Sequence, residues 1–94
     1  MSLPVVYRVV AQDDVDAAYN WYEQQRAGLG DRFLDALHQR ANSIGANPEL
    51  YAVLYLDVRA APLRRFPYVV YYRIETDRVV VIAVRHGRRP SRPR

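Results

Sequence analysis

The sequence contains no cysteine, and that absence excludes disulfides and cysteine–zinc sites. It also lacks any apolar run of transmembrane length. Its N-terminus, MSLPVVYRVV, has neither the basic region nor the long apolar stretch of a signal peptide. Nothing in these features suggests an oxidising compartment. We therefore expect a cytoplasmic protein that does not engage a membrane.

Lysine is also absent, so arginine supplies all 14 basic side chains, against 10 acidic ones. Guanidinium groups suit planar, bidentate contact with phosphate or carboxylate. The formal net charge of +4 is concentrated toward the C-terminus and indicates an acidic partner, either nucleic acid or protein. An arginine-biased genome would explain the missing lysines equally well, and composition alone does not choose.

The length of 94 residues is near the lower end of what forms a self-sufficient core. Half of the residues are hydrophobic, so the chain should fold, with a stability margin to which a partner would add. We expect a single domain over residues 1–87. Residues 88–94 are basic and broken by proline, which predicts a tail that stays flexible unless a partner orders it.

Two strand-like runs near the C-terminus form the predicted centre of the domain. They are Tyr68–Glu75 and Arg78–Arg85, joined by a tight polar link. The first run alternates, and this alternation predicts one buried face. That face consists of Tyr68, Val70, Tyr72 and Ile74. The second run contains VVVIAV, apolar at both parities, which is typical of a central strand covered on both sides.

Two amphipathic helices are predicted upstream of this hairpin. The expected elements are a short strand over Val5–Val10, a helix capped by Asp13 or Asp14 that ends near Gln25 or Arg26, and a helix from about Asp31 to Ala46. The link Ala27-Gly28-Leu29-Gly30 supplies two flexible residues for a reversal. Such a helical hairpin must cover an apolar surface, and the buried face of the first run is the natural one.

The pattern is weaker between the helices and the C-terminal hairpin. Tyr51–Leu56 is apolar but short, and Val58–Phe66 contains Pro62, which cannot donate to a ladder and predicts an edge strand. The resulting order β-α-α-β-β-β gives an α+β fold, with a helical hairpin packed on a small, mostly antiparallel sheet.

Several fragments of the chain together resemble a known family. They are AAYNWYEQQRAGLGDRF, the spacing from Ile44 to Pro48 followed by Tyr51, an arginine at Arg59 before LRRFPYVVYYRI, and the closing VIAVRHGRRP. In this order they resemble the RelE/ParE superfamily, the toxins of type II toxin–antitoxin modules, also labelled plasmid stabilisation proteins. The resemblance covers nearly the whole chain. It implies a small bacterial protein that inhibits growth and is neutralised by a cognate antitoxin.

The superfamily contains two activities, and the resemblance favours one of them. RelE-like members are endonucleases that cut messenger RNA on the ribosome, whereas ParE-like members poison DNA gyrase and cleave nothing themselves. The fragments FPYVVYYRI and VRHGRRP are closer to the ParE side. We expect a toxin that binds DNA gyrase, with a ribosome-dependent endonuclease as the second hypothesis and a non-toxic basic interaction module as the third.

Metal-free cleavage of RNA requires a base, a cation for the crowded phosphorane and an acid for the leaving oxygen. Arginine supplies the cation but, being permanently protonated, no base. His86 is the one obvious proton-transfer residue near the arginines, so an endonuclease would use Arg65, Arg85 and His86. RelE-like enzymes typically use a cluster of lysines, or a glutamate–histidine pair with a C-terminal tyrosine. This chain has no lysine and no tyrosine after Tyr72, which lowers the endonuclease hypothesis.

Strand alternation bears on the same hypothesis. If Arg85 shares the open face of the sheet with Val79, Val81 and Ala83, then His86 leans toward the helices. A histidine there is more often a hydrogen-bonded structural residue than a base. A β-bulge would re-aim the side chain and reverse this expectation.

Seven arginines form the predicted surface for the target or the antitoxin. They are Arg59, Arg64, Arg65, Arg73, Arg85, Arg88 and Arg89. Each alone is explained as ordinary solvated charge. As a group near the open side of the sheet, they are expected to hold phosphate or an acidic antitoxin segment.

The remaining candidates favour structural roles. Tyr19, Trp21 and Tyr22 could form a docking surface for an antitoxin helix, but core packing is the favoured interpretation. His38 is expected on the surface, and two histidines without cysteine make no metal site. We therefore expect no metal, no cofactor and no small-molecule substrate.

Overall fold

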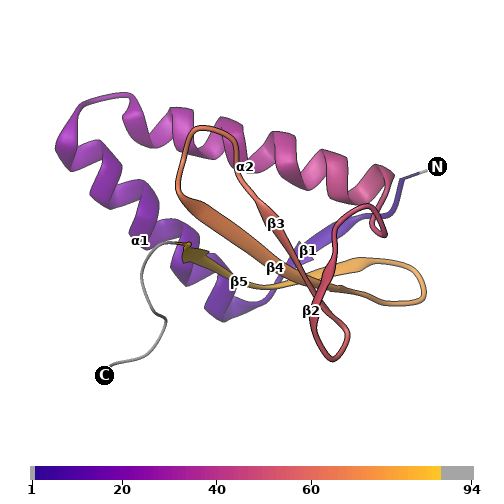
Figure 1. Cartoon of the computed structure of the whole chain (residues 1–94). Helices are drawn as coiled ribbons and strands as arrows, with labels where there is room; N and C mark the ends of the chain where they lie inside the picture. The colour runs from indigo at the N-terminus through magenta and orange to yellow at the C-terminus, as the bar shows by residue number, and fades with distance from the viewer. Residues whose placement is uncertain (1, 88–94) are drawn as a thin grey trace, which may run out of the picture.

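The computed structural model describes residues 2–87, which form two helices and five strands (Figure 1). In chain order these are β1 (Val5–Tyr7), α1 (Val9–Gln25), α2 (Leu29–Ala46), β2 (Val53–Tyr55), β3 (Val58–Pro62), β4 (Tyr68–Ile74) and β5 (Val79–His86). The basic segment 88–94, predicted to be a flexible tail, lies outside the described residues.

The strands form one sheet in the order β1-β5-β4-β3-β2. β1 pairs with β5 in parallel, and every other pair is antiparallel. The predicted α+β fold with a mostly antiparallel sheet is confirmed. The structure adds one strand, β2, which forms a hairpin with β3. All three residues of β2 are exposed, so no alternation marked it in the sequence.

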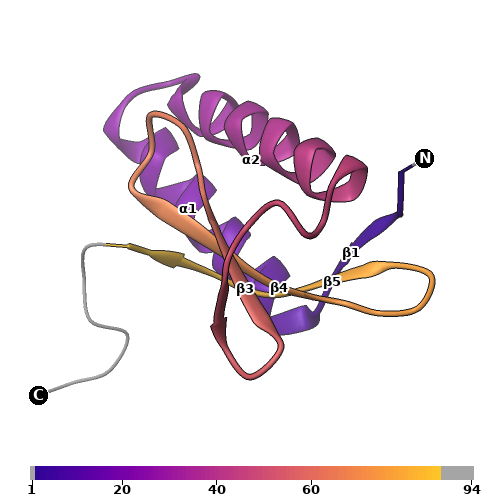
Figure 2. The same ribbon diagram turned by 45° about the vertical axis from the view of Figure 1, so that its right-hand side comes forward.

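Both helices pack on the same face of the sheet (Figures 1 and 2). The predicted buried face of β4 is the one they cover, and Tyr72 at its centre is 0% exposed. The hydroxyl of Tyr72 donates a hydrogen bond of 2.7 Å to the carbonyl of Pro48. The helices contribute a row of buried side chains to the same core, namely Ala11, Val15, Ala18, Tyr22, Phe33, Leu37 and Ile44.

The first strand is shorter, and the first helix longer, than predicted. The strand ends at Tyr7, and the backbone N–H of Arg8 continues its pairing by donating to Val81 O at 3.0 Å. The helix then begins at Val9, so the expected N-cap at Asp13 or Asp14 is wrong. Arg8 is the N-cap residue and makes no side-chain capping bond. The pairing of β1 with β5 sets this boundary, and local sequence does not reveal it.

The link between the helices is closed by one glutamate of α1. Glu23 Oε1 accepts hydrogen bonds from the backbone N–H groups of Gly28 at 2.7 Å and Gly30 at 3.1 Å. Gly28 has a φ of 89°, a conformation that favours glycine. At Gly30 an added Cβ would lie 2.8 Å from side-chain atoms of Tyr19 and Glu23. The first glycine thus makes the turn, while the second permits the helices to approach.

A β-bulge in β5 corrects the predicted alternation. Tyr72 lies opposite Val81 and Tyr71 opposite Ala83, so Ile82 is an extra residue in the strand. Val79 and Val81, predicted on the open face, are buried on the helix side with Tyr72. Beyond the bulge the parity changes, because Val84 and His86 now pair with the helix-facing Val70 and Tyr68.

The prediction of an edge strand is wrong for β3 as a whole but holds locally at Pro62. β3 lies between β4 and β2, with Pro62 at its last position opposite Val69. The short β2 pairs only with the first part of β3, from Val58 to Arg59. A proline is therefore tolerated where the outer side of β3 has no ladder partner.

Candidate functional site

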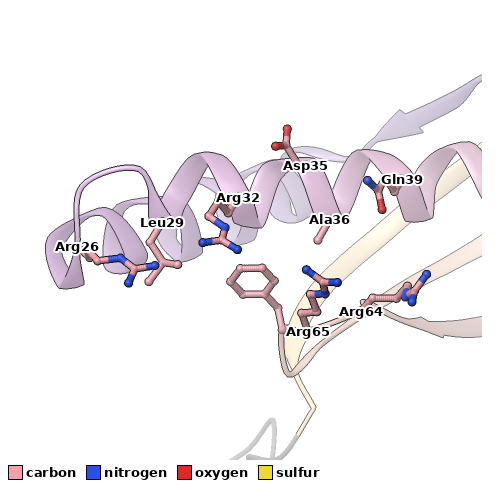
Figure 3. A pocket seen from close by; sticks show the side chains of 9 residues that line it. Arg26, Leu29, Arg32, Asp35, Ala36, Gln39, Arg64 and Arg65 are labelled. Carbon is pink, nitrogen blue, oxygen red and sulfur yellow. The ribbon is translucent and has the colours of Figure 1, made fainter.

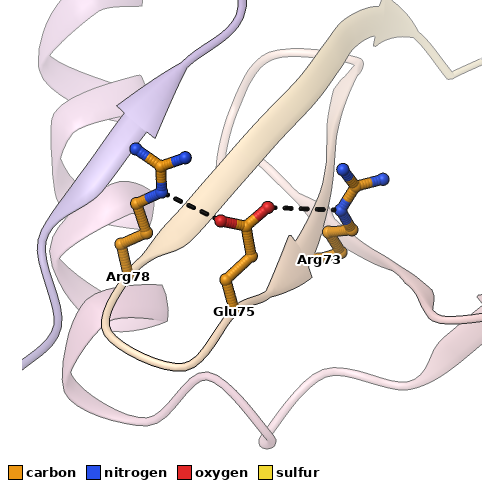
Figure 4. Close-up of polar contacts among 3 residues, drawn as sticks. All are labelled: Arg73, Glu75 and Arg78. Atoms are coloured by element: carbon orange, nitrogen blue, oxygen red, sulfur yellow. Dashed lines mark hydrogen bonds and ion pairs between the residues drawn. The ribbon is translucent and has the colours of Figure 1, made fainter.

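The open face of the sheet carries one of the predicted arginines in an ion-pair chain. Arg73 of β4 lies 3.6 Å from Glu75, whose other oxygen accepts a 2.9 Å hydrogen bond from Arg78 Nε (Figure 4). The hydrogen bond from Arg78 is the largest cause that lowers the pKa of Glu75 below its ordinary value, and Arg73 adds to it. One carboxylate thus sits between two cations at the β4–β5 turn.

Arg85 is held by an acidic residue of α1. Its Nε lies 3.0 Å from Asp14 Oδ2, and the same oxygen accepts a 2.9 Å hydrogen bond from the backbone N–H of Val84. β1 pairs with β5 only as far as Val81, and Asp14 provides the hydrogen-bond acceptor for a backbone N–H of β5 beyond that point. The predicted role of Asp14 was to cap the first helix. Its carboxylate instead accepts hydrogen bonds from β5.

His86 lies on the helix side of the sheet, the predicted side, but the bulge is what places it there. Val79 and Val81 are on that side too, and strict alternation from them would have put His86 on the open face. His86 pairs with Tyr68, and the two ring centroids are 5.3 Å apart in an edge-to-face arrangement. It also lines a hollow of about 510 Å³ between α1 and the end of β5, together with Trp21, Tyr22 and Arg85. Arg85 pairs with Val69 and so points to the opposite face at its Cβ.

Arg59 is a structural residue on the helix side, away from the open face. It pairs with Tyr72, and its Nη1 donates to the carbonyl of Tyr51 at 2.7 Å and to that of Glu49 at 3.4 Å. Burial raises the pKa of Tyr72, and the nearby Arg59 opposes that shift. The Tyr51 hydroxyl also contacts Arg40 and lies 2.8 Å from Ser43 Oγ. This network fixes the segment between α2 and β2.

Arg64 and Arg65 lie in the β3–β4 loop and line a second hollow of about 510 Å³ (Figure 3). Two arginines that the sequence did not single out, Arg26 and Arg32, line it from the helical hairpin. No sequence pattern marks them, because only the packing of the loop against α2 brings them near Arg64 and Arg65.

The predicted arginine group is therefore divided among separate surfaces. Arg73 belongs to the open side, Arg85 reaches Asp14 of α1, Arg59 belongs to the network around Tyr51, and the two loop arginines line the hollow beside α2. Arg88 and Arg89 lie outside the described residues. The prediction of one cluster near the open side is wrong for the described arginines, and their binding role stays a prediction.

The three residues of the endonuclease hypothesis do not line one cavity. Arg65 belongs to the hollow beside α2, whereas Arg85 and His86 line the one beside α1. Within residues 2–87, no three acidic, histidine or cysteine side chains gather as metal ligands. Over the same residues, no helix has the length and apolar character needed to span a membrane.

The aromatic residues of α1 divide between core and surface. Tyr22 is buried as favoured from the sequence, and its ring lies against those of Phe33 and Phe66. Trp21 is 55% exposed, so the expected core packing is wrong for this residue. The indole ring of Trp21 contacts the ring of Tyr22 edge-on, and much of the indole is exposed to solvent. His38 is on the surface as expected.

Comparisons with known proteins point to one kind of protein. The model of a family described as "ParE toxin of type II toxin-antitoxin system, parDE" matches residues 5–90. Toxin ParE2 from two strains of Mycobacterium tuberculosis is 34% identical over 80 residues, a match that covers 81% of this chain and 73% of the relative.

Two solved structures share the fold. One is from the chromosomal ParDE toxin–antitoxin system of P. aeruginosa, with a TM-score of 0.78 and 16% identity, covering 90% of this chain and 96% of the other. The second is from the toxin–antitoxin complex RelBE2 of Mycobacterium tuberculosis, with a TM-score of 0.67 and 22% identity over 92% of each chain. At these identities the likeness establishes the fold alone.

Proposed function

This chain belongs to the ParE toxin family of type II toxin–antitoxin systems, and from that premise we propose that it inhibits bacterial growth by binding DNA gyrase. The mode of action is binding of the target, with no bond cleaved by the toxin itself. Gyrase is the target that the resemblance to ParE-like sequences implies.

One observation carries the proposal of binding over chemistry. RNA cleavage would need a proton-transfer group and cations to meet at one phosphate. Arg65 lines a different hollow from Arg85 and His86, and the guanidinium of Arg85 is already engaged by Asp14. The ring of His86 packs against Tyr68. This arrangement supports a structural role for the histidine.

A cognate antitoxin is the second proposed partner. The two structural neighbours come from toxin–antitoxin systems, and the net charge of +4 suits an acidic segment that folds over the toxin. Exposed apolar residues along β2 and its flanks, namely Leu50, Val53, Leu54, Tyr55 and Leu56, offer additional surface for a protein partner.

The test induces expression of the chain in bacteria and measures plasmid supercoiling and messenger RNA integrity in the same culture. The proposal predicts that plasmid supercoiling falls while messenger RNA remains intact. Cleaved messages with normal supercoiling would replace it with the endonuclease hypothesis. Unharmed growth with neither effect would favour a non-toxic interaction module.

A further inference from the structure

The hollow beside α2 is lined by arginines whose side chains make no hydrogen bond or ion pair within the described chain. Residues 2–87 contain ten arginines, and five of these hold an acidic or carbonyl partner or a tyrosine hydroxyl, namely Arg40, Arg59, Arg73, Arg78 and Arg85. Of the five side chains without such a partner, four line this hollow, and the fifth is Arg8.

The charge of this hollow is unbalanced. Arg26, Arg32, Arg64 and Arg65 are opposed by a single acidic lining residue, Asp35. Figure 3 shows the Asp35 side chain directed away from the β3–β4 loop that carries Arg64 and Arg65. Four like charges around one cavity repel one another, and an anionic ligand would relieve that repulsion.

The backbone of the loop adds an independent observation. Arg65 has a φ of 72°, the left-handed conformation that glycine adopts more easily than any other residue. A non-glycine residue in this conformation is a reason to look for function there. The strained residue is also one that extends its guanidinium toward α2 in Figure 3.

The arginines stand in two groups with apolar surface among them. Arg26 and Arg32 come from the helical hairpin, and Arg64 and Arg65 from the facing loop (Figure 3). Leu29, Ala36 and Phe66 supply apolar lining, and Gln39 is the remaining polar residue. The ring of Phe66 is fixed by edge-on contacts with Tyr22 and Phe33. A lone phosphate would suit donors that converge on one point. Separated cations around apolar surface suit a ligand with separated anionic groups and an apolar side chain.

We propose that this hollow binds an acidic segment of a protein partner, whose carboxylates pair with the four arginines and whose apolar side chain packs on Phe66. Under the proposed function that partner is the antitoxin, and to this extent the inference rests on it. The peptide-binding measurement below requires neither gyrase nor growth inhibition.

The first experiment measures fluorescence anisotropy with three labelled probes. These are a short synthetic peptide with glutamates on both sides of a leucine, the same peptide with glutamine for glutamate, and an oligothymidylate of equal length. We expect the acidic peptide to bind, more weakly as salt is raised, and the glutamine peptide not to bind. Failure of the acidic peptide to bind, or tighter binding of the oligothymidylate, would overturn the proposal.

The second experiment assigns the binding to the hollow. Arg32→Gln and Arg65→Gly should each weaken binding of the acidic peptide about threefold to fivefold, the size of an exposed ion pair. Arg8→Gln is the matched control, because the Arg8 side chain is exposed, has no hydrogen-bond or ion-pair partner in the described chain and lies outside the hollow. Glycine suits the backbone at position 65, so Arg65→Gly should melt no lower than the parent protein.

Equal affinity of all variants would place the peptide elsewhere and end the proposal. If gyrase is unaffected by the toxin but the two variants lose peptide, the docking site stands and the proposed target falls. If gyrase is inhibited but peptide binding ignores both substitutions, only the docking site falls.

Discussion

At the scale of single residues, Glu75 shows how two arginines act on one carboxylate. Its folded-state pKa lies below the ordinary value, chiefly through the hydrogen bond from Arg78. A lowered folded pKa means that this group adds stability above the unfolded pKa and loses it as pH falls through the folded pKa. The contribution therefore disappears on the acid side.

A pH titration of the Glu75 carboxyl carbon, followed by NMR, measures this shift. We expect its midpoint to lie below that of a glutamate in an unfolded chain. Arg78→Gln should move the midpoint upward more than Arg73→Gln, because Arg78 approaches to 2.9 Å and Arg73 only to 3.6 Å. A larger effect from Arg73→Gln would contradict this ordering.

Tyr72 tests the buried face of β4. Tyr72→Phe keeps the ring but removes the hydrogen bond to the Pro48 carbonyl, and should lower the free energy of unfolding by about 1 kcal/mol. Tyr71→Phe is the matched control, since Tyr71 lies on the opposite face and its hydroxyl makes no hydrogen bond within residues 2–87. Urea unfolding of both proteins gives the comparison, and equal losses would refute the assignment.

At the scale of elements, the helical hairpin depends on Glu23. Glu23→Ala removes the acceptor for the backbone N–H groups of Gly28 and Gly30, and should cost about 1–2 kcal/mol of stability, as the loss of a helix cap does. Thermal unfolding measures the loss. Gln24→Ala, at an exposed neighbouring position, should change little.

A substitution that preserves an oxygen acceptor separates capping from charge. Glu23→Gln should lose less stability than Glu23→Ala, because its side-chain oxygen still accepts from the turn. Identical losses in the two variants would mean that the carboxylate charge, rather than its hydrogen bonds, holds the link.

Most elements could be predicted from local pattern, and their exact limits could not. The alternation of Tyr68, Val70 and Tyr72 identified the buried face, and Gly28 and Gly30 identified the helical link. The bulge at Ile82 escaped detection because VVVIAV is apolar at both parities and allows either register. The start of α1 at Val9 escaped because pairing between β1 and β5 decides it.

At the scale of the whole molecule, the arginines show where sequence reasoning ends. Charge and residue type predict an anionic partner, and they also predict, wrongly, that seven arginines form one group. Folding separates them, and brings Arg26 and Arg32 of the helical hairpin to Arg64 and Arg65 of a distant loop. No spacing in the sequence encodes a contact between segments that far apart.

The complex with an antitoxin should be more stable than the toxin alone. A partner that binds only the folded chain stabilises it by about 2.7 kcal/mol at one hundred times its dissociation constant. The product of the neighbouring open reading frame, co-expressed and purified with the toxin, supplies the test by differential scanning calorimetry. Equal melting of toxin and complex would contradict this expectation.

The fold alone does not identify the target, since a ParDE structure and a RelBE2 structure both share it. The target therefore has to be argued from the placement of side chains. That placement puts Arg65 in a different hollow from Arg85 and His86, and it is the observation on which we base the proposal of binding over cleavage.

The most direct measurement adds the purified chain, and its His86→Gln variant, to purified DNA gyrase and follows the supercoiling of a relaxed plasmid. The account predicts that both proteins inhibit supercoiling to a similar extent, because it assigns His86 a structural role against Tyr68. Normal supercoiling with the parent protein, together with ribosome-dependent RNA cleavage that His86→Gln abolishes, would contradict it.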